Sequence, residues 1–162
     1  MHKIILHKKY KKGGIKMKVK DCMCYEVAYL TPDSTVEDCA KLMCSKHVGC
    51  IPVCDNNKTI VGLVTDRDVI LRSIACNKDI KTTPISDIMT CQICSCGPEE
   101  DINEAEKKMS EEQIRRLPVV DENNKIIGII TLGDLCANKD VNTEGVCNTL
   151  ENICKYNNKN AE

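Results

Sequence analysis

Two stretches of the chain decide its fold: IPVCDNNKTIVGLVTDRDV at residues 51–69 and LPVVDENNKIIGIITLGDL at residues 117–135. They align without a gap at an offset of 66 residues, the difference between positions 117 and 51. In each stretch an apolar run with a Pro-Val pair is followed by polar residues and by a second apolar run with one glycine. Short aliphatic runs separated by Asp and Asn predict a β-hairpin. The chain therefore contains the same hairpin twice.

The repeat extends beyond the hairpins, because residues 20–70 align with residues 86–136. Identities outside the hairpins pair Asp21 with Asp87, Met23 with Met89, Pro32 with Pro98, and Met43 with Met109. Thr35-x-x-Asp38 and Asp101-x-x-Glu104 each predict a capped helix start before the hairpin. Each copy is predicted to be strand–helix–strand–strand–helix, an α/β (α+β) unit too small to bury its sheet alone. Two pseudo-symmetric copies packed sheet to sheet solve that problem.

The expected domains are repeat one at 17–75, a linker at 76–85, repeat two at 86–137, and a C-terminal helix with a frayed tail at 138–162. The leader, 1–16, holds six lysines and no acidic residue. Its last codons could read AAA-GGA-GGA-ATT-AAA before the ATG of Met17, which would be a ribosome-binding site. We therefore expect translation to start at Met17, the alternative being a disordered basic arm that touches nucleic acid or anionic lipid.

Composition limits the function classes. No apolar run is long enough to span a membrane and the N-terminus lacks a signal-peptide pattern, so a cytoplasmic protein is expected. The 13 cysteines are then predicted to be thiols. The chain has 23 basic residues; without the six lysines of the leader, 17 face 24 acidic ones, a net charge of −7. Nucleic-acid binding is therefore not expected.

A second motif, T-x-x-D, follows each hairpin at residues 65–68 and 131–134. These features, with SDIMT at 86–90 in repeat two, make the two copies resemble CBS domains, named after cystathionine β-synthase. The resemblance implies that the clefts between the repeats bind AMP, ADP, ATP or S-adenosylmethionine. It places Asp68 and Asp134 on ribose hydroxyls and Thr65 and Thr131 near ribose or phosphate. The plainer alternative is a helix capping box, which uses the same residue types.

Charge distinguishes the two copies. Arg115 and Arg116 precede the second hairpin, where similar nucleotide-sensing proteins place cations toward phosphates, and Gly49 and Cys50 align with them. We expect Thr65, Arg67 and Asp68 to share a phosphate-binding cleft with Arg115 and Arg116. The cleft of Thr131 and Asp134, facing Gly49, is then predicted to hold fewer cations. The alternative for the arginines is a solvated surface pair.

No catalytic constellation emerges, since His47 is the sole histidine after the leader, so no enzyme and no required cofactor are expected. The favoured function is a regulatory module that senses an adenine nucleotide, assembles as a homodimer and acts on a protein target. Cys91-x-x-Cys94-x-Cys96 supports a different hypothesis, a metal or redox sensor, although zinc commonly uses paired C-x-x-C motifs and apolar packing is favoured. A ligand-free dimerisation scaffold is the remaining alternative.

Overall fold

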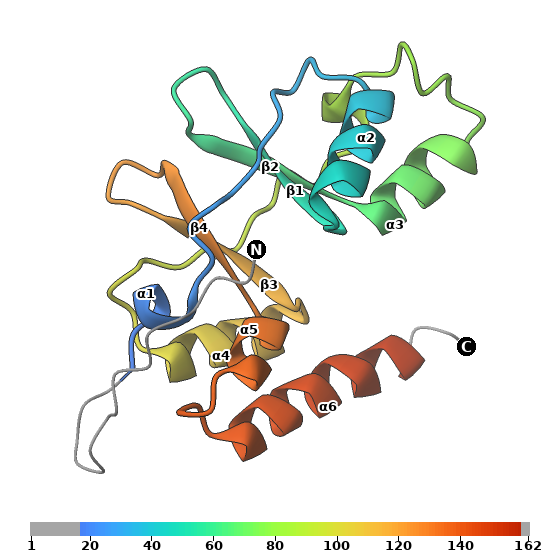
Figure 1. Ribbon diagram of the computed structural model, residues 1–162. Helices are drawn as coiled ribbons and strands as arrows, with labels where there is room; N and C mark the ends of the chain where they lie inside the picture. Colours follow the sequence, from blue (N-terminus) through green and yellow to red (C-terminus); the bar gives the residue numbers. More distant parts are fainter. Residues whose placement is uncertain (1–16, 160–162) are drawn as a thin grey trace.

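The computed structural model describes residues 17–159 and has a mixed α/β architecture. Its elements are α1 (Val19–Cys22), α2 (Val36–Lys46), β1 (Cys50–Cys54), β2 (Ile60–Thr65), α3 (Asp66–Val69), η1 (Ile70–Ile74), η2 (Ile85–Asp87), α4 (Ile102–Glu112), β3 (Arg116–Val120), β4 (Ile126–Thr131), α5 (Leu132–Ala137) and α6 (Thr143–Lys159). The hairpins lie in the middle, with α2 and α3 at one end and α4, α5 and α6 at the other (Figure 1). The α/β prediction is confirmed.

Both predicted hairpins form, and they share one register. Strand β1 pairs antiparallel with β2, and β3 pairs antiparallel with β4. Val53 lies opposite Gly62 and Val119 opposite Gly128, and each ladder shifts register at the next residue. At their turn ends the hairpins also bond to each other through a bridge between Thr59 and Lys125. The repeat in sequence is therefore a repeat in backbone geometry.

The segment that opens each copy differs from its prediction as a strand. In the described chain it forms single bridges, first to the other copy and then to its own. Cys24 bonds to Ile129 of β4, with N···O distances of 2.9 and 3.0 Å, whereas Leu30 pairs with Val53 of β1. The segment of repeat two follows the same order, since Thr90 pairs with Leu63 of β2 in repeat one and Cys96 pairs with Val119 of its own β3. Because each segment changes its partner after one pair, no continuous ladder can form.

This crossing exchanges core side chains between the copies. Val19 and Met23 pack in the core of repeat two, and Ile85 and Ile88 pack in the core of repeat one. The crossing segments pass directly over the hairpin glycines. A Cβ on Gly128 would lie 2.6 Å from Sδ of Met23, and one on Gly62 would lie 2.5 Å from Sδ of Met89. These identical Met and Gly pairs recur because each methionine fills the space above the other copy's glycine.

The helix boundaries follow local capping chemistry. Thr35 and Asp38 form the predicted capping box at α2, and the carbonyls of Ile80 and Thr83 accept bonds from the first amides of that helix. At α4, Asp101 accepts from the amide of Asn103 at 2.9 Å, so this cap differs from the predicted pairing with Glu104. The predicted linker therefore contributes to the start of α2.

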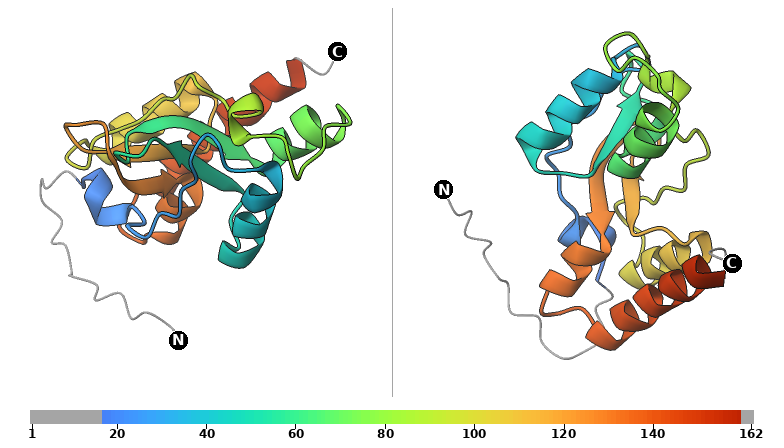
Figure 2. Two further views of the ribbon diagram at one scale, coloured as in Figure 1. Left: turned by 90° about the horizontal axis from the view of Figure 1, so that it is seen from above. Right: turned by 90° about the vertical axis from the view of Figure 1, so that its right-hand side faces the viewer.

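The predicted C-terminal helix is α6, which packs on α4 and α5 (Figure 2). Val146 and Ile153 are its buried residues in the core of repeat two. No helix in residues 17–159 is long and apolar enough to cross a bilayer. The expectations for the leader 1–16 and for the last residues, 160–162, lie outside the described residues.

Candidate functional site

A cavity of about 800 Å³ lies between the two repeats. Its wall is drawn from four segments, within residues 24–28, 46–52, 115–116 and 129–133. Both repeats therefore contribute to it, and the segment 24–28 enters through the crossing described above. The volume falls in the ordinary range for small-ligand sites, about 300–1,000 Å³.

The T-x-x-D motif of repeat two is at one side of this cavity. Thr131 and Gly133 line the wall, and Asp134 follows directly. Thr131 is the N-cap of α5, and Oδ2 of Asp134 accepts from its amide at 2.8 Å and its hydroxyl at 2.6 Å. Oδ1 of Asp134 has no hydrogen-bond partner among residues 17–159. One carboxylate oxygen therefore caps the helix while the other remains able to accept.

The wall also carries three cations: Lys46 at the end of α2, and Arg115 and Arg116 at the start of β3. None of the three forms an ion pair with a residue of the described chain. Arg116 lies opposite Thr131 in the β3–β4 ladder. Positive charge without a protein partner is thus concentrated beside the Thr131 motif.

This arrangement corrects the predicted distribution of charge. The two arginines line the cavity together with Thr131 and Gly49, the cleft for which fewer cations were expected. The reason is the strand pairing, which holds Arg116 next to Thr131 within one hairpin. Sequence reasoning also missed Lys46, although the repeat alignment contains its signal, because the aligned residue in repeat two is the acidic Glu112.

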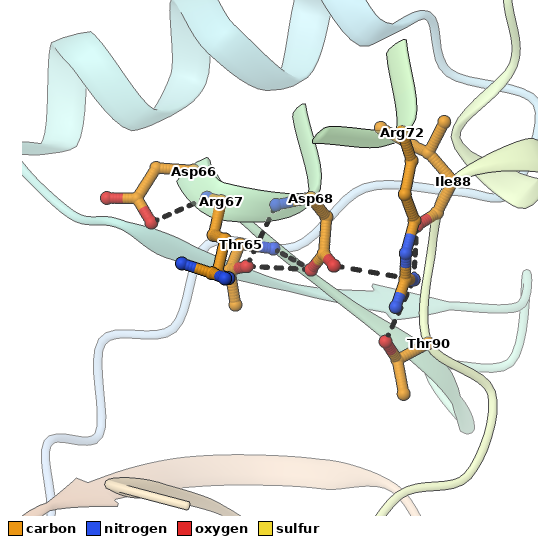
Figure 3. A network of polar contacts seen from close by, with 7 residues as sticks. All are labelled: Thr65, Asp66, Arg67, Asp68, Arg72, Ile88 and Thr90. Carbon is orange, nitrogen blue, oxygen red and sulfur yellow. Dashed lines mark hydrogen bonds and ion pairs between the residues drawn. The ribbon is translucent and has the colours of Figure 1, made fainter. Parts of the chain in front are cut away.

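Four predicted site residues are absent from the wall of this cavity: Thr65, Arg67, Asp68 and Asp134, of which Asp134 directly follows the wall residue Gly133. Thr65 and Asp68 form the same capping box as their counterparts, with Oδ2 of Asp68 accepting from the Thr65 amide at 2.9 Å and hydroxyl at 2.7 Å. Oδ1 of Asp68, however, lies 3.4 Å from Nη1 of Arg72 (Figure 3). The side chain of Arg67 is exposed. The two motifs therefore share a cap but differ in the second oxygen.

The rest of the cavity wall is mainly apolar and contains two thiols and one carboxylate, that of Glu26. Val27, Ile51 and Ile129 contribute aliphatic surface, and no aromatic side chain is among the lining residues. Cys24 is exposed, whereas Cys50 is buried. Burial raises the pKa of Cys50 to about 11, so its thiol stays neutral at physiological pH.

The cysteines of the C-x-x-C-x-C segment differ widely in exposure. Cys91 is exposed, Cys94 is half-buried and Cys96 is buried. Burial raises the pKa of Cys96 to about 12, which disfavours the thiolate that zinc requires. Within residues 17–159, no group of three His, Cys, Asp or Glu side chains is placed to hold a metal ion. These three cysteines are therefore placed as ordinary core and surface side chains rather than as a set of metal ligands.

Comparison with known proteins places this geometry in a family. The family model of the CBS domain matches residues 19–74 and 85–139, which include both hairpins and both T-x-x-D motifs. The chain belongs to the CBS domain family. CBS domain pairs are regulatory ligand-binding modules. The CBS domain-containing protein YhcV of Bacillus subtilis (strain 168) is 40% identical over 139 residues, covering 86% of this chain and 96% of YhcV.

Two solved CBS structures contain adenosyl ligands. The CBS domain pair of protein MJ0100, in complex with 5′-methylthioadenosine and S-adenosyl-L-methionine, is 26% identical with a TM-score of 0.69; the match covers 75% of this chain and 94% of that one. The structure of CBSX2 in complex with AMP is 31% identical with a TM-score of 0.63, covering 72% and 91%. The CBS pair described above shares the fold of both.

Proposed function

We propose that this CBS pair senses an adenine nucleotide in the cavity beside Thr131. The observation that carries the proposal is the combination of a spare carboxylate oxygen on Asp134 with three cations, Lys46, Arg115 and Arg116, that have no ion-pair partner in the described chain. The AMP complex of CBSX2 and the adenosyl complexes of MJ0100 support the ligand class. The cations favour AMP, ADP or ATP over S-adenosylmethionine, which carries positive charge and no phosphate.

Each part of the ligand then has a partner of suitable chemistry. Asp134 accepts hydrogen bonds from ribose hydroxyls through Oδ1, since an ionised carboxylate is purely an acceptor. Arg115 and Arg116 donate charge-assisted bonds to phosphate oxygens, a geometry for which the guanidinium fork is well suited. The base lies on aliphatic side chains such as Val27 and Ile51. The ligand touches both repeats, so occupancy changes how they are held together and signals to a protein target.

The proposed unit of this sensor is a homodimer. Ile70, Leu71 and Ile74, on the continuous α3–η1 segment, have exposed fractions of 54%, 48% and 58%. Three adjacent aliphatic side chains at this level of exposure favour an interface rather than a solvated surface. The proposed location is the cytoplasm, as expected from the sequence, where the cysteines would stay reduced.

Calorimetry with AMP, ADP, ATP, adenosine and S-adenosylmethionine tests the proposal. We expect AMP to bind at least about 10-fold more tightly than adenosine, because a charge-assisted bond contributes roughly 1.5–3 kcal/mol. Replacing Arg116→Gln should remove most of that difference. Arg67→Gln, at an arginine outside the cavity wall, is the matched control and should leave it intact. Equal affinities for AMP and adenosine would refute phosphate recognition, and binding of no ligand would favour a scaffold.

The exposed thiol of Cys24 provides an independent test of location. Cys24 lines the cavity and Cys44 is exposed elsewhere, on α2. Saturating AMP should slow alkylation of Cys24 several-fold, read by peptide mass spectrometry, and leave Cys44 unchanged. Equal alkylation of Cys24 with and without bound AMP would place the ligand outside this cavity.

A further inference from the structure

The two T-x-x-D motifs of the CBS pair have different surroundings at three aligned positions. In the repeat alignment Arg72, Asp66 and Glu112 take the positions of Asn138, Leu132 and Lys46. Glu112 comes from repeat two and Lys46 from repeat one, as expected for clefts that both copies build. The largest difference is at Arg72, because that side chain contacts the motif itself.

Arg72 joins the repeat-one motif to the opening segment of repeat two. Its Nη1 donates to the carbonyl of Ile88 at 2.8 Å and to Oγ1 of Thr90 at 3.1 Å, and it lies 3.4 Å from Oδ1 of Asp68 (Figure 3). Thr90 belongs to the opening segment of repeat two, and its aligned residue is Cys24, which lines the cavity on the other side. The guanidinium thus lies between the Asp68 carboxylate and the segment of repeat two whose counterpart in repeat one lines the cavity beside Thr131.

The backbone around Arg72 is specialised for this position. Residues 70–74 form a π-helical turn, in which the amide of Ala75 donates to the carbonyl of Ile70 at 2.9 Å. The buried Ser73 anchors the turn through a 2.8 Å bond from its hydroxyl to the carbonyl of Val69. Such wide turns are rare and are often found at functional sites.

Repeat two has no equivalent of this contact. Helix α5 ends at Ala137, and the side-chain amide of the aligned Asn138 donates to Sγ of Cys22 at 3.3 Å. It makes no hydrogen bond to Asp134 among the described residues. The same motif is therefore engaged by an arginine in repeat one and left accessible in repeat two.

We propose that Arg72 makes the CBS pair asymmetric, so that it binds one adenosyl ligand, at the Thr131 cavity. Arg72 engages the Asp68 oxygen that a ribose would need and ties it to the opposite wall through Thr90. This inference rests on the proposed function and adds its stoichiometry and the residue that sets it.

The stoichiometry of binding tests the inference. Calorimetry should give one equivalent of AMP per chain for the wild type. Arg72→Asn, which copies the residue at 138, should bind two equivalents of 5′-methylthioadenosine, an uncharged probe, where the wild type binds one. Adding Asp68→Asn should return the count to one. Lys41→Asn, a charge removed from the exposed face of α2, is the control and should keep one equivalent.

A melting curve shows whether each variant is folded. If Arg72→Asn is unstable, Arg72→Gln, which can still donate to the Ile88 carbonyl, is measured in its place. Two equivalents of either ligand bound by the wild type would overturn this inference, and so would one equivalent of 5′-methylthioadenosine bound by a folded Arg72 variant. Either result would leave the proposed function standing. Binding of no adenosyl ligand by any variant would overturn both.

Discussion

At the scale of single residues, the T-x-x-D carboxylates show how one side chain can serve both stability and binding. In both motifs Oδ2 accepts from the amide and hydroxyl of the threonine three residues earlier. The capping interpretation and the binding interpretation are therefore compatible, since they concern different oxygens. What separates Asp134 from Asp68 is whether Oδ1 already has an internal partner.

Asp134→Asn should separate the two roles. The amide oxygen of Asn can still accept from the Thr131 amide, so the melting temperature should change little. One uncharged oxygen cannot accept from both ribose hydroxyls, so AMP affinity should fall about 10- to 150-fold, equivalent to roughly 1.5–3 kcal/mol. Calorimetry and thermal melting of the same sample measure both. Asp68→Asn is the control, and a larger loss there than at Asp134 would show that the ligand uses the other cleft.

The residues of the site were predictable to the extent that their motif encodes them. Thr131 and Gly49 were named from the repeat alignment, and both line the cavity. Lys46 and Arg72 were not predicted. Lys46 lies at the end of a helix and lines the cavity from there. Arg72 contacts Ile88 and Thr90 from a π-helical turn, which no pattern in the sequence predicts. Contacts of this kind depend on tertiary placement.

At the scale of secondary-structure elements, the hairpins and helices followed from local pattern, but the opening segments did not. A short apolar segment indicates an extended backbone without indicating its partner. Residues 24 and 90 pair with the opposite copy, and residues 30 and 96 pair with their own. The recurring Met and Gly pairs contain this information, yet only the structure shows that the methionine of one copy packs on the glycine of the other.

Gly128→Ala should therefore destabilise the CBS pair by about 1–3 kcal/mol, as is usual for an overpacked core. The added Cβ would lie 2.6 Å from Sδ of Met23 and 3.1 Å from the backbone carbonyl of Cys24, and the carbonyl cannot move freely because it belongs to the crossing bridge. Gly97→Ala is the control, since its nearest neighbour is the Glu100 carboxylate at 3.6 Å. Urea unfolding measures the stability of both variants. Equal unfolding midpoints for Gly128→Ala and Gly97→Ala would contradict the close packing of Met23 on Gly128.

At the scale of the whole molecule, neither repeat is complete by itself, but the two differ in what covers their helices. Repeat two receives Val19 and Met23 from the start of the chain and is covered by α6. Repeat one exposes Ile70, Leu71 and Ile74. The aligned residues of repeat two are Cys136, Ala137 and Asp140, so this aliphatic surface belongs to repeat one alone.

An exposed aliphatic surface on one repeat favours the proposed closed two-fold dimer, in which each copy presents the same surface to the other. Light scattering at micromolar concentration should give twice the mass of the 18.1 kDa chain. Leu71→Glu and Ile74→Glu should each shift the mass toward the monomer, since a carboxylate buried at the interface is unpaired. Leu150→Glu, at an α6 leucine that is 42% exposed, is the matched control and should stay dimeric. A monomeric wild type would refute the dimer, and dissociation caused by Leu150→Glu alone would move the interface to α6.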